Sequence, residues 1–206
     1  MLTCCLLVGV GRTFLTSKVI DHTEEILTRN ENDEGLAIFY CKRDEELRRN
    51  PVSILHSLVR QLTTSAFSRI TLRKPNVQED IKDLYQKHRI HGSDLTMEVC
   101  KSLLLLFTNL YPRTTIILDA LDECDKDSRS SILDVIEYII QESTKPVKVF
   151  ISSRRDGDIR EWLRQNVNID IQATDNGDDI ARFRPRETHP ASEVVKDVSG
   201  GSETGS

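Results

Sequence analysis

The 206-residue sequence has no excess of positive charge, no paired-cysteine motif and no long apolar run. Its 28 basic and 33 acidic side chains give a formal net charge of -5, which leaves no basic field to gather nucleic acid. The five cysteines are odd in number and include no CxxC pair, which fits neither a disulfide framework nor a zinc site. No apolar run approaches the roughly 18 residues that a membrane span needs. These absences argue against nucleic acid and membrane partners and predict a protein of the reducing cytoplasm.

The first ten residues are apolar enough to resemble the core of a signal peptide. No positive residue precedes them, and the first basic residue, Arg12, comes after them, which argues against secretion. Cys4 and Cys5 leave two interpretations open, acylation or small apolar residues of a strand, and the second is the commoner role of such cysteines.

The most specific stretch of the sequence runs from Thr114 to Cys124. Apolar, largely β-branched residues follow one another without alternation up to Leu118, as in a strand buried on both faces of a parallel sheet. Asp119, Asp122 and Glu123 begin where that strand should end. Ligands bind outside the carboxyl ends of strands in open α/β sheets, so these carboxylates are placed to hold a hard cation such as Mg²⁺ against phosphate oxygens. The alternative is a strand followed by an acidic turn that holds no ligand.

Strands alternate with helices along the rest of the chain. Strands are predicted at residues 2–8, 36–41, 114–118, 147–152 and 168–172. Helices are predicted from Thr13, from the Asn50-Pro51 start, from the capping residues 93–96 to Leu110, across residues 132–140 and at residues 159–163. In the first helix, the face expected to be buried carries Leu15, Val19, His22 and Ile26. This order predicts a three-layer α/β fold, a mostly parallel sheet of about five strands flanked by helices and joined by right-handed crossovers.

Two segments are less defined. Residues 77–85 suggest an amphipathic helix, and His88 and His91 beyond it are either metal ligands or, because no carboxylate or thiol accompanies them, part of a solvated surface. Residues 184–206 end in a glycine- and serine-rich stretch with nothing to bury. We therefore expect one domain at residues 1–183 and a disordered tail at residues 184–206.

A glycine-rich turn, Gly9-Val10-Gly11-Arg12-Thr13, lies between the first strand and the first helix. A phosphate-binding loop at this place needs backbone N–H groups that converge on phosphate, a lysine that bridges two phosphates and a hydroxyl on Mg²⁺. Thr13 supplies the hydroxyl. Leu6 stands at the first glycine of the G-x-x-x-x-G-K-[ST] pattern and Arg12 at its lysine, so this turn alone is a weak signal.

Several stretches occur together in an order typical of one family. They are the helix start at residues 13–21, Phe39-Tyr40-Cys41, Asn50-Pro51-Val52 with its helix, Leu118 to Cys124, and Val149 to Arg154. From about Gly9 to Phe183 the chain resembles the NACHT-type P-loop NTPase domain of fungal STAND signalling proteins, also called the nephrocystin-3-like N-terminal domain. The resemblance implies an ATP or GTP switch whose partners are the nucleotide and other domains or protomers of a switch assembly.

The same resemblance implies roles for individual residues. Gly9, Gly11 and Arg12 would cradle phosphates, and Thr13 and Asp119 would hold Mg²⁺.

The resemblance also implies which residues act at the γ-phosphate. Asp122 or Glu123 would position the attacking water, and Arg154 would read the γ-phosphate. The other interpretation of Arg154 is a surface arginine paired with an acid such as Asp156.

The departures from the family pattern bear on activity. Arginine at position 12 keeps the charge, but its planar fork is not a conservative substitute for an ammonium group in a fitted phosphate site. A leucine at position 6 would be strained if it needed the positive φ of a loop glycine. Weak or absent hydrolysis is therefore expected, so whether the protein is an enzyme stays open, and weak nucleotide binding is expected too.

Three hypotheses follow. The first is a nucleotide-binding module of a STAND-type signalling switch, present as a fragment because the chain ends before the lid and winged-helix parts. The second is a degenerate scaffold that keeps the fold and acts only through protein–protein contacts, which Leu6 and Arg12 favour. The third, a true hydrolase, ranks last because the lysine is missing.

Overall fold

The computed structural model describes residues 4–8, 12–29, 34–69, 96–154, 157–163 and 168–170. Its strands are β1 (Cys4–Val8), β2 (Gly35–Tyr40), β3 (Thr114–Asp119), β4 (Val147–Ser152) and β5 (Asn168–Asp170). Its helices are α1 (Arg12–Arg29), α2 (Glu46–Arg49), α3 (Pro51–Arg69), α5 (Met97–Leu110), the 3-10 turn η1 (Leu121–Glu123), α6 (Lys126–Glu142) and α7 (Gly157–Leu163). The predicted helix at residues 77–85, the histidines His88 and His91, and the predicted tail at 184–206 lie outside the described residues. None of the helices in the described ranges combines the length and apolar character that a bilayer crossing requires.

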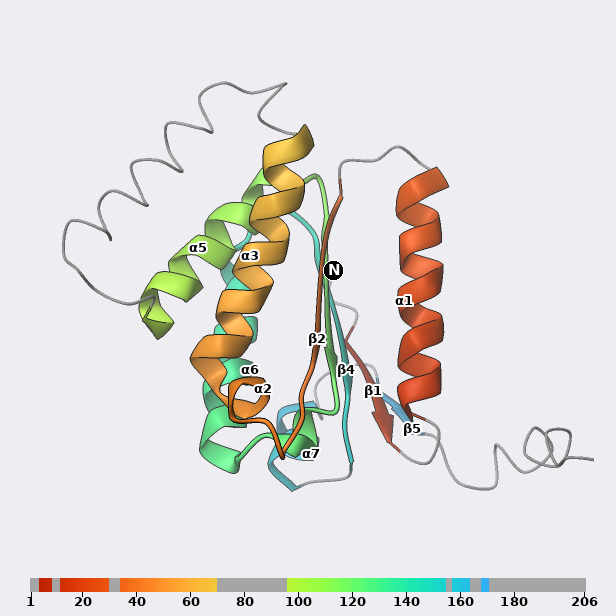
Figure 1. Cartoon of the computed structure of the whole chain (residues 1–206), viewed down its shortest axis with the longest axis vertical. Coiled ribbons are helices and arrows are strands. Elements are labelled where there is room, and N and C mark those ends of the chain that lie inside the picture. The colour runs from red at the N-terminus through yellow and green to blue at the C-terminus, as the bar shows by residue number, and fades with distance from the viewer. Residues whose placement is uncertain are drawn as a thin grey trace, which may run out of the picture.

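The strands lie in one sheet in the order β2-β3-β4-β1-β5, and every pairing is parallel. All carboxyl ends therefore meet at one edge of the sheet, the lower edge in Figure 1. β4 lies between β3 and β1, with Leu118 opposite Ile151, so the residues that follow β3 and β4 are neighbours. The predicted α/β fold with a parallel sheet covered by helices is confirmed.

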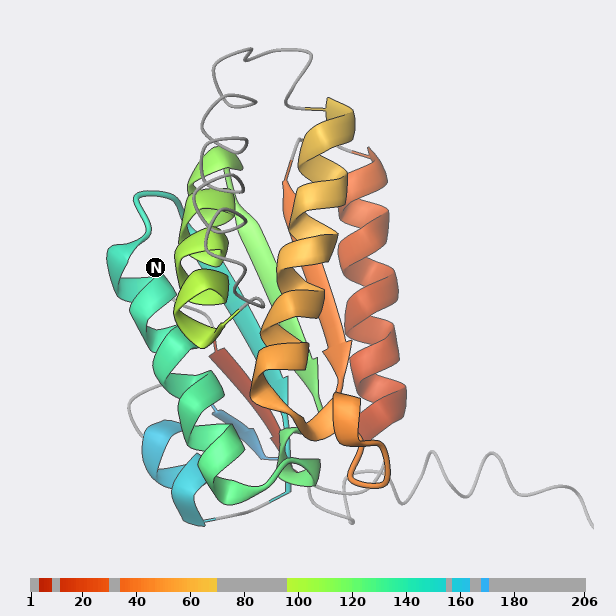
Figure 2. The same ribbon diagram turned by 60° about the vertical axis from the view of Figure 1, so that its left-hand side comes forward.

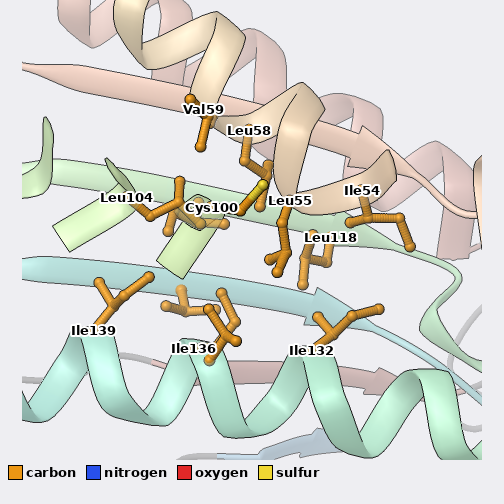
Figure 3. Packing of buried hydrophobic residues seen from close by; sticks show 14 of the residues in the cluster. Ile54, Leu55, Leu58, Val59, Cys100, Leu104, Leu118, Ile132, Ile136 and Ile139 are labelled. Atoms are coloured by element: carbon orange, nitrogen blue, oxygen red, sulfur yellow. The ribbon is translucent and has the colours of Figure 1, made fainter. Parts of the chain in front are cut away.

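Helices cover both faces of the sheet, which gives the predicted three layers. α1 lies on one face, and α3, α5 and α6 lie on the other (Figures 1 and 2). The larger core lies on the α3, α5 and α6 side, and Figure 3 shows side chains of these helices and of the sheet interleaved there. The smaller core, on the α1 side, joins Ile20 to Ile117 and Phe150.

The apolar run of β3 explains why this strand needs cover on both sides. Ile116 and Leu118 belong to the larger core, whereas Ile117 between them belongs to the smaller one. Successive side chains of a strand point to opposite faces, so an unbroken apolar run can only be satisfied between two layers. The next residue on the face of Ile117 is Asp119, which brings a carboxylate to the α1 side.

Predicted capping residues begin two of the helices. Asn50 accepts a hydrogen bond on its side-chain oxygen from the backbone N–H of Ser53, at 3.1 Å, ahead of Pro51 at the first position of α3. Thr96 accepts from the backbone N–H of Val99, at 3.4 Å, at the start of α5. Each side chain satisfies a backbone donor that a helix start leaves unpaired, as predicted.

The buried face of α1 differs from the prediction. His22 is exposed and Ile26 is 39% exposed, whereas Thr16 and Ile20 are buried. Leu15 and Val19 pack against the smaller core as predicted, so the prediction was wrong for His22 and Ile26. It omitted Thr16, because that buried residue meets a carboxylate rather than an apolar neighbour.

The outer edge of β2 is closed by side chains. β2 stands at one end of the strand order, so among the described residues one side of its backbone has no neighbouring strand. Gln61 of α3 accepts from the backbone N–H of Ile38 at 2.9 Å and donates to its carbonyl at 2.8 Å. Arg48 donates to the carbonyl of Tyr40 at 3.1 Å. These contacts occupy backbone groups that would otherwise be available to pair with another strand.

We expect Gln61→Leu to lower the free energy of unfolding by about 1–3 kcal/mol, because it leaves the amide and carbonyl of Ile38 without their partners. Gln141→Leu is the matched control, since Gln141 is exposed on α6 and its loss should change stability by less than about 0.5 kcal/mol. Urea denaturation of both variants measures the difference. Equal losses in the two variants would show that Gln61 does not secure this edge.

Candidate functional site

α1 and the sheet meet at two successive levels near the carboxyl ends of the strands. At the first level, Ile20 packs against Ile117 and Phe150. One helical turn earlier in α1, and two residues later in each strand, the side chains become polar. This second level consists of Thr16, Asp119 and Ser152, which we call the Asp119 cluster.

The Asp119 cluster is buried and hydrogen-bonded. Thr16 Oγ1 donates to Asp119 Oδ1 at 2.6 Å, and Ser152 Oγ donates to the same oxygen. Ser152 Oγ also accepts from the backbone N–H of Ala120 at 2.9 Å. Thr16 and Ser152 are fully buried, and Asp119 is 4% exposed. A buried carboxylate is costly unless it accepts hydrogen bonds, and the two hydroxyl groups supply two of them to Oδ1.

These contacts fix the start of α1 beside the end of β3. α1 begins at Arg12, and Thr13, an exposed residue, lies one turn before Thr16. Thr13 therefore lies beyond the strand end, where the first N–H groups of an 18-residue helix favour an anion. The structure describes Arg12 by its backbone only, and Gly9 and Gly11 lie outside the described residues.

Leu6 is a strand residue rather than a loop residue. It lies inside β1, opposite Ile151 of β4 and Asn168 of β5. An extended strand accepts leucine without strain, so the backbone strain expected at this position is not found.

The chain turns sharply after Asp119. Ala120 has a left-handed backbone with φ of 55°, an uncommon conformation for a residue with a side chain, and it starts the 3-10 turn η1. The N–H of Glu123 donates to the carbonyl of Ala120 at 2.9 Å and closes the turn. Asp122 is 3% exposed, so the turn brings a second carboxylate back against the end of β4.

Arg154 binds both carboxylates of this turn. Its backbone N–H donates to Asp122 Oδ1 at 2.8 Å, and its Nε lies 3.3 Å from Asp122 Oδ2. Its guanidinium also lies 3.7 Å from Glu123 Oε1. Arg154 itself remains 66% exposed. The structure thus brings Asp122, Glu123 and Arg154 together, while the alternative partner Asp156 lies outside the described residues.

Arg43 is a further member of this group that the sequence prediction did not include. It follows β2, its Nε lies 3.8 Å from Glu123 Oε2, and it donates to the carbonyl of Asp122 at 3.3 Å. Glu123 therefore has one oxygen near each of two arginines. Arg43 was missed because it belongs to a charged connection, Lys42 to Arg49, that looks like solvated loop in the sequence.

Thr16 and Ser152 were also missed as site residues. The signal for Thr16 was its spacing, since residues three apart share a helix face and Thr13 was already a candidate. The signal for Ser152 was its position at the last residue of a predicted strand. Recognising its contact with Asp119 needed the order of the strands, which local patterns do not contain.

Acidic side chains surround Tyr40 at the end of β2. Tyr40 lies opposite Asp119 in the β2–β3 register. Burial first, and then the nearby carboxylates of Asp119, Glu24 and Asp21, raise the pKa of the Tyr40 phenol. Arg43 and Arg154 lie next to η1, where both pair with Glu123.

The oxygen ligands fit Mg²⁺ that arrives with a phosphate group. Among the described residues, no three His, Cys, Asp or Glu side chains gather as a metal site. Mg²⁺ commonly uses only one or two carboxylates and takes its other ligands from phosphate and water. Asp119 supplies one carboxylate of that kind at the strand end. The donor set therefore suits an ion shared with a phosphate ligand and does not suit an ion held by protein alone.

A protein family and a solved structure are similar to this chain. The family model described as Nephrocystin 3, N-terminal matches residues 1–154. Among solved structures, the Aeropyrum pernix ORC2 protein in ADPNP–ADP complexes is similar, with 14% sequence identity and a TM-score of 0.46. That similarity covers 84% of this chain and 41% of the ORC2 chain. No curated protein matches the sequence.

Proposed function

The chain belongs to the nephrocystin 3 N-terminal family, and on that premise we propose that its P-loop NTPase-like fold binds ATP or GTP with Mg²⁺ as the module of a STAND-type signalling switch. The observation that carries the proposal is the 2.6 Å hydrogen bond from Thr16 to Asp119. It joins the helix that follows the glycine-rich turn to the strand that ends in carboxylates. A nucleotide site of this class needs the phosphate-binding turn and the carboxylates together at one edge of the sheet.

In this proposal the phosphates lie at the N-terminus of α1. Gly9, Gly11 and Arg12 offer backbone N–H groups and one positive charge there. Thr13 and Asp119 would hold Mg²⁺, which when bound neutralises charge on the phosphate oxygens. Thr16 acts indirectly, because its hydroxyl fixes the orientation of Asp119.

The two acids of η1 differ in their surroundings, which suggests different roles. Asp122 is almost fully buried and accepts from the backbone of Arg154, so it positions that residue. The Glu123 side chain is 25% exposed and can reach water. We therefore assign the water-positioning role to Glu123, and the γ-phosphate contact to Arg154, which a phosphate would draw from its ion pair with Glu123.

The direct test is thermal unfolding of the full chain with increasing MgATP or MgGTP. A ligand present at 100 times its Kd should stabilise the fold by about 2.7 kcal/mol, a rise of roughly 5–10 °C in Tm for a chain of this size. Millimolar ligand is therefore enough to reveal a Kd tighter than about 100 μM. No shift with either nucleotide, in the presence of Mg²⁺, would contradict the proposal.

Arg12→Lys should increase the stabilisation by nucleotide, because an ammonium group fits closer to the phosphates than a guanidinium fork. Arg113→Lys is the matched control. Arg113 pairs with Glu34 at 3.4 Å at the opposite edge of the sheet, so its exchange should leave the nucleotide response unchanged.

A scaffold that has lost nucleotide is the second candidate, favoured by the ion pairs that occupy Glu123. It predicts no nucleotide-induced shift in the wild type and no gain in Arg12→Lys. A hydrolase would require Mg²⁺-dependent phosphate release that disappears in Glu123→Gln.

A further inference from the structure

Arg43 belongs to the connection between β2 and α2, and the backbone on both sides of it is anchored. The N–H of Cys41 donates to the carbonyl of Asp119 at 2.9 Å, one residue beyond the end of β2. The N–H of Lys42 donates to the carbonyl of Arg48 at 3.2 Å and closes the connection on itself. The place from which the Arg43 side chain starts is therefore fixed relative to the end of β3.

Arg43 and Arg154 share the two acids of η1. Arg43 Nε lies 3.8 Å from Glu123 Oε2, and Arg43 Nη2 donates to the carbonyl of Asp122 at 3.3 Å. Arg154 lies 3.7 Å from the other Glu123 oxygen and 3.3 Å from Asp122 Oδ2. These four side chains carry two positive and two negative charges. The arginine side chains are 61% and 66% exposed, so a guanidinium can change its partner, whereas the Asp122 carboxylate is buried and stays where it is.

The balance of charge changes when one arginine leaves. In the proposed function, Arg154 leaves its ion pair with Glu123 to meet the γ-phosphate. Its departure removes a compensating charge from two carboxylates, and such a loss is costly beside the buried Asp122. Arg43 lowers this cost because it remains beside Glu123 and keeps its hydrogen bond to the Asp122 carbonyl. A nucleoside diphosphate has no γ-phosphate, so its binding leaves Arg154 in place.

We propose that Arg43 is a positioning residue that sets the preference of the site for a nucleoside triphosphate over a diphosphate. It acts through Glu123 and Arg154: by compensating the charge of Glu123, it makes Arg154 available to the γ-phosphate. This inference rests on the proposed function. It extends that function by giving the connection after β2 a part in telling the two nucleotides apart.

The test is isothermal titration calorimetry of the full chain with MgADP and with MgAMP-PNP, a non-hydrolysable analogue of MgATP, or with the guanine pair if that pair stabilises the wild type. Arg43→Gln should weaken AMP-PNP binding by about three- to tenfold and change the Kd for ADP by less than about twofold. Lys42→Gln is the matched control. It removes one positive charge from the same connection, but Lys42 pairs with Glu45 instead of η1, so both Kd values should stay within about twofold of the wild type.

Two further variants test the route of the effect. Glu123→Gln removes the charge that holds Arg154, so it should tighten AMP-PNP binding, a change of opposite sign to that in Arg43→Gln. Arg154→Gln should itself lose the preference for AMP-PNP over ADP. Arg43→Gln added to Arg154→Gln should then cause no further change, because the arginine that Arg43 releases is gone. Glu123→Gln also keeps the inference testable if Arg43→Gln fails to fold.

The outcomes separate this inference from the proposed function. Equal preference for AMP-PNP over ADP in wild type and Arg43→Gln would overturn the role of Arg43 and leave nucleotide binding intact. So would an equal loss in Lys42→Gln, which would reveal a general effect of charge, or weaker AMP-PNP binding in Glu123→Gln. A further loss in the double variant would show that Arg43 acts without Arg154. No binding of either nucleotide by the wild type would overturn both proposals.

Discussion

Leu118→Ala is expected to lower the free energy of unfolding by about 2–5 kcal/mol. Leu118 is fully buried on β3 and lies between Ile54 and Leu55 of α3 and Ile132 of α6 (Figure 3). Alanine would lose the transfer energy of the removed carbons and leave a cavity that rigid strands and helices close only in part. Because Asp119 follows directly, the same change should loosen the strand end that carries it.

Leu47→Ala is the matched control for this substitution. Leu47 lies on α2 and is 73% exposed, so the identical change of side chain should alter stability by less than about 0.5 kcal/mol. Urea denaturation with a common slope for wild type and variants gives both values. Comparable losses in Leu118→Ala and Leu47→Ala would mean that β3 is not the centre of the core.

The strand that organises the site could be predicted because its signal is local. The unbroken run of Ile116, Ile117 and Leu118 fits only a strand covered on both faces, and the structure divides these residues between two cores as that requires. The start of α3 could be predicted for a similar reason, since Asn50 and Pro51 satisfy the needs of a helix start within their own segment.

The remaining parts of the site depend on contacts between distant segments. Ser152 meets Asp119 because β4 lies beside β3, and no periodicity in either strand encodes that order. Thr16 was overlooked because a search for apolar residues ignores a threonine whose buried partner is a carboxylate. Arg43 was overlooked because its role in the site depends on its ion pair with Glu123, which lies far away in the sequence.

The proposed function requires Asp119 to be a nucleotide-linked metal ligand rather than a structural acid. Asp119→Asn separates these roles. An asparagine oxygen can still accept hydrogen bonds from the hydroxyl groups of Thr16 and Ser152. The ligand-free variant should therefore keep its free energy of unfolding within about 1 kcal/mol of the wild type.

The response of Asp119→Asn to nucleotide should differ from that of the wild type far more than its stability does. A neutral amide is a poor ligand for Mg²⁺ beside phosphate, so stabilisation by MgATP, about 2.7 kcal/mol at 100 times the wild-type Kd, should be lost. Asp125→Asn is the control with the same chemical change, because the Asp125 side chain is 70% exposed and pairs with Arg49 at 4.0 Å outside the Asp119 cluster.

The decisive measurement is the rise in Tm caused by MgATP in wild type, Asp119→Asn and Asp125→Asn, compared at one ligand concentration. We predict equal rises in wild type and Asp125→Asn and none in Asp119→Asn. A full rise in Asp119→Asn would mean that nucleotide binds away from Asp119. No rise in the wild type would contradict nucleotide binding and favour the scaffold hypothesis.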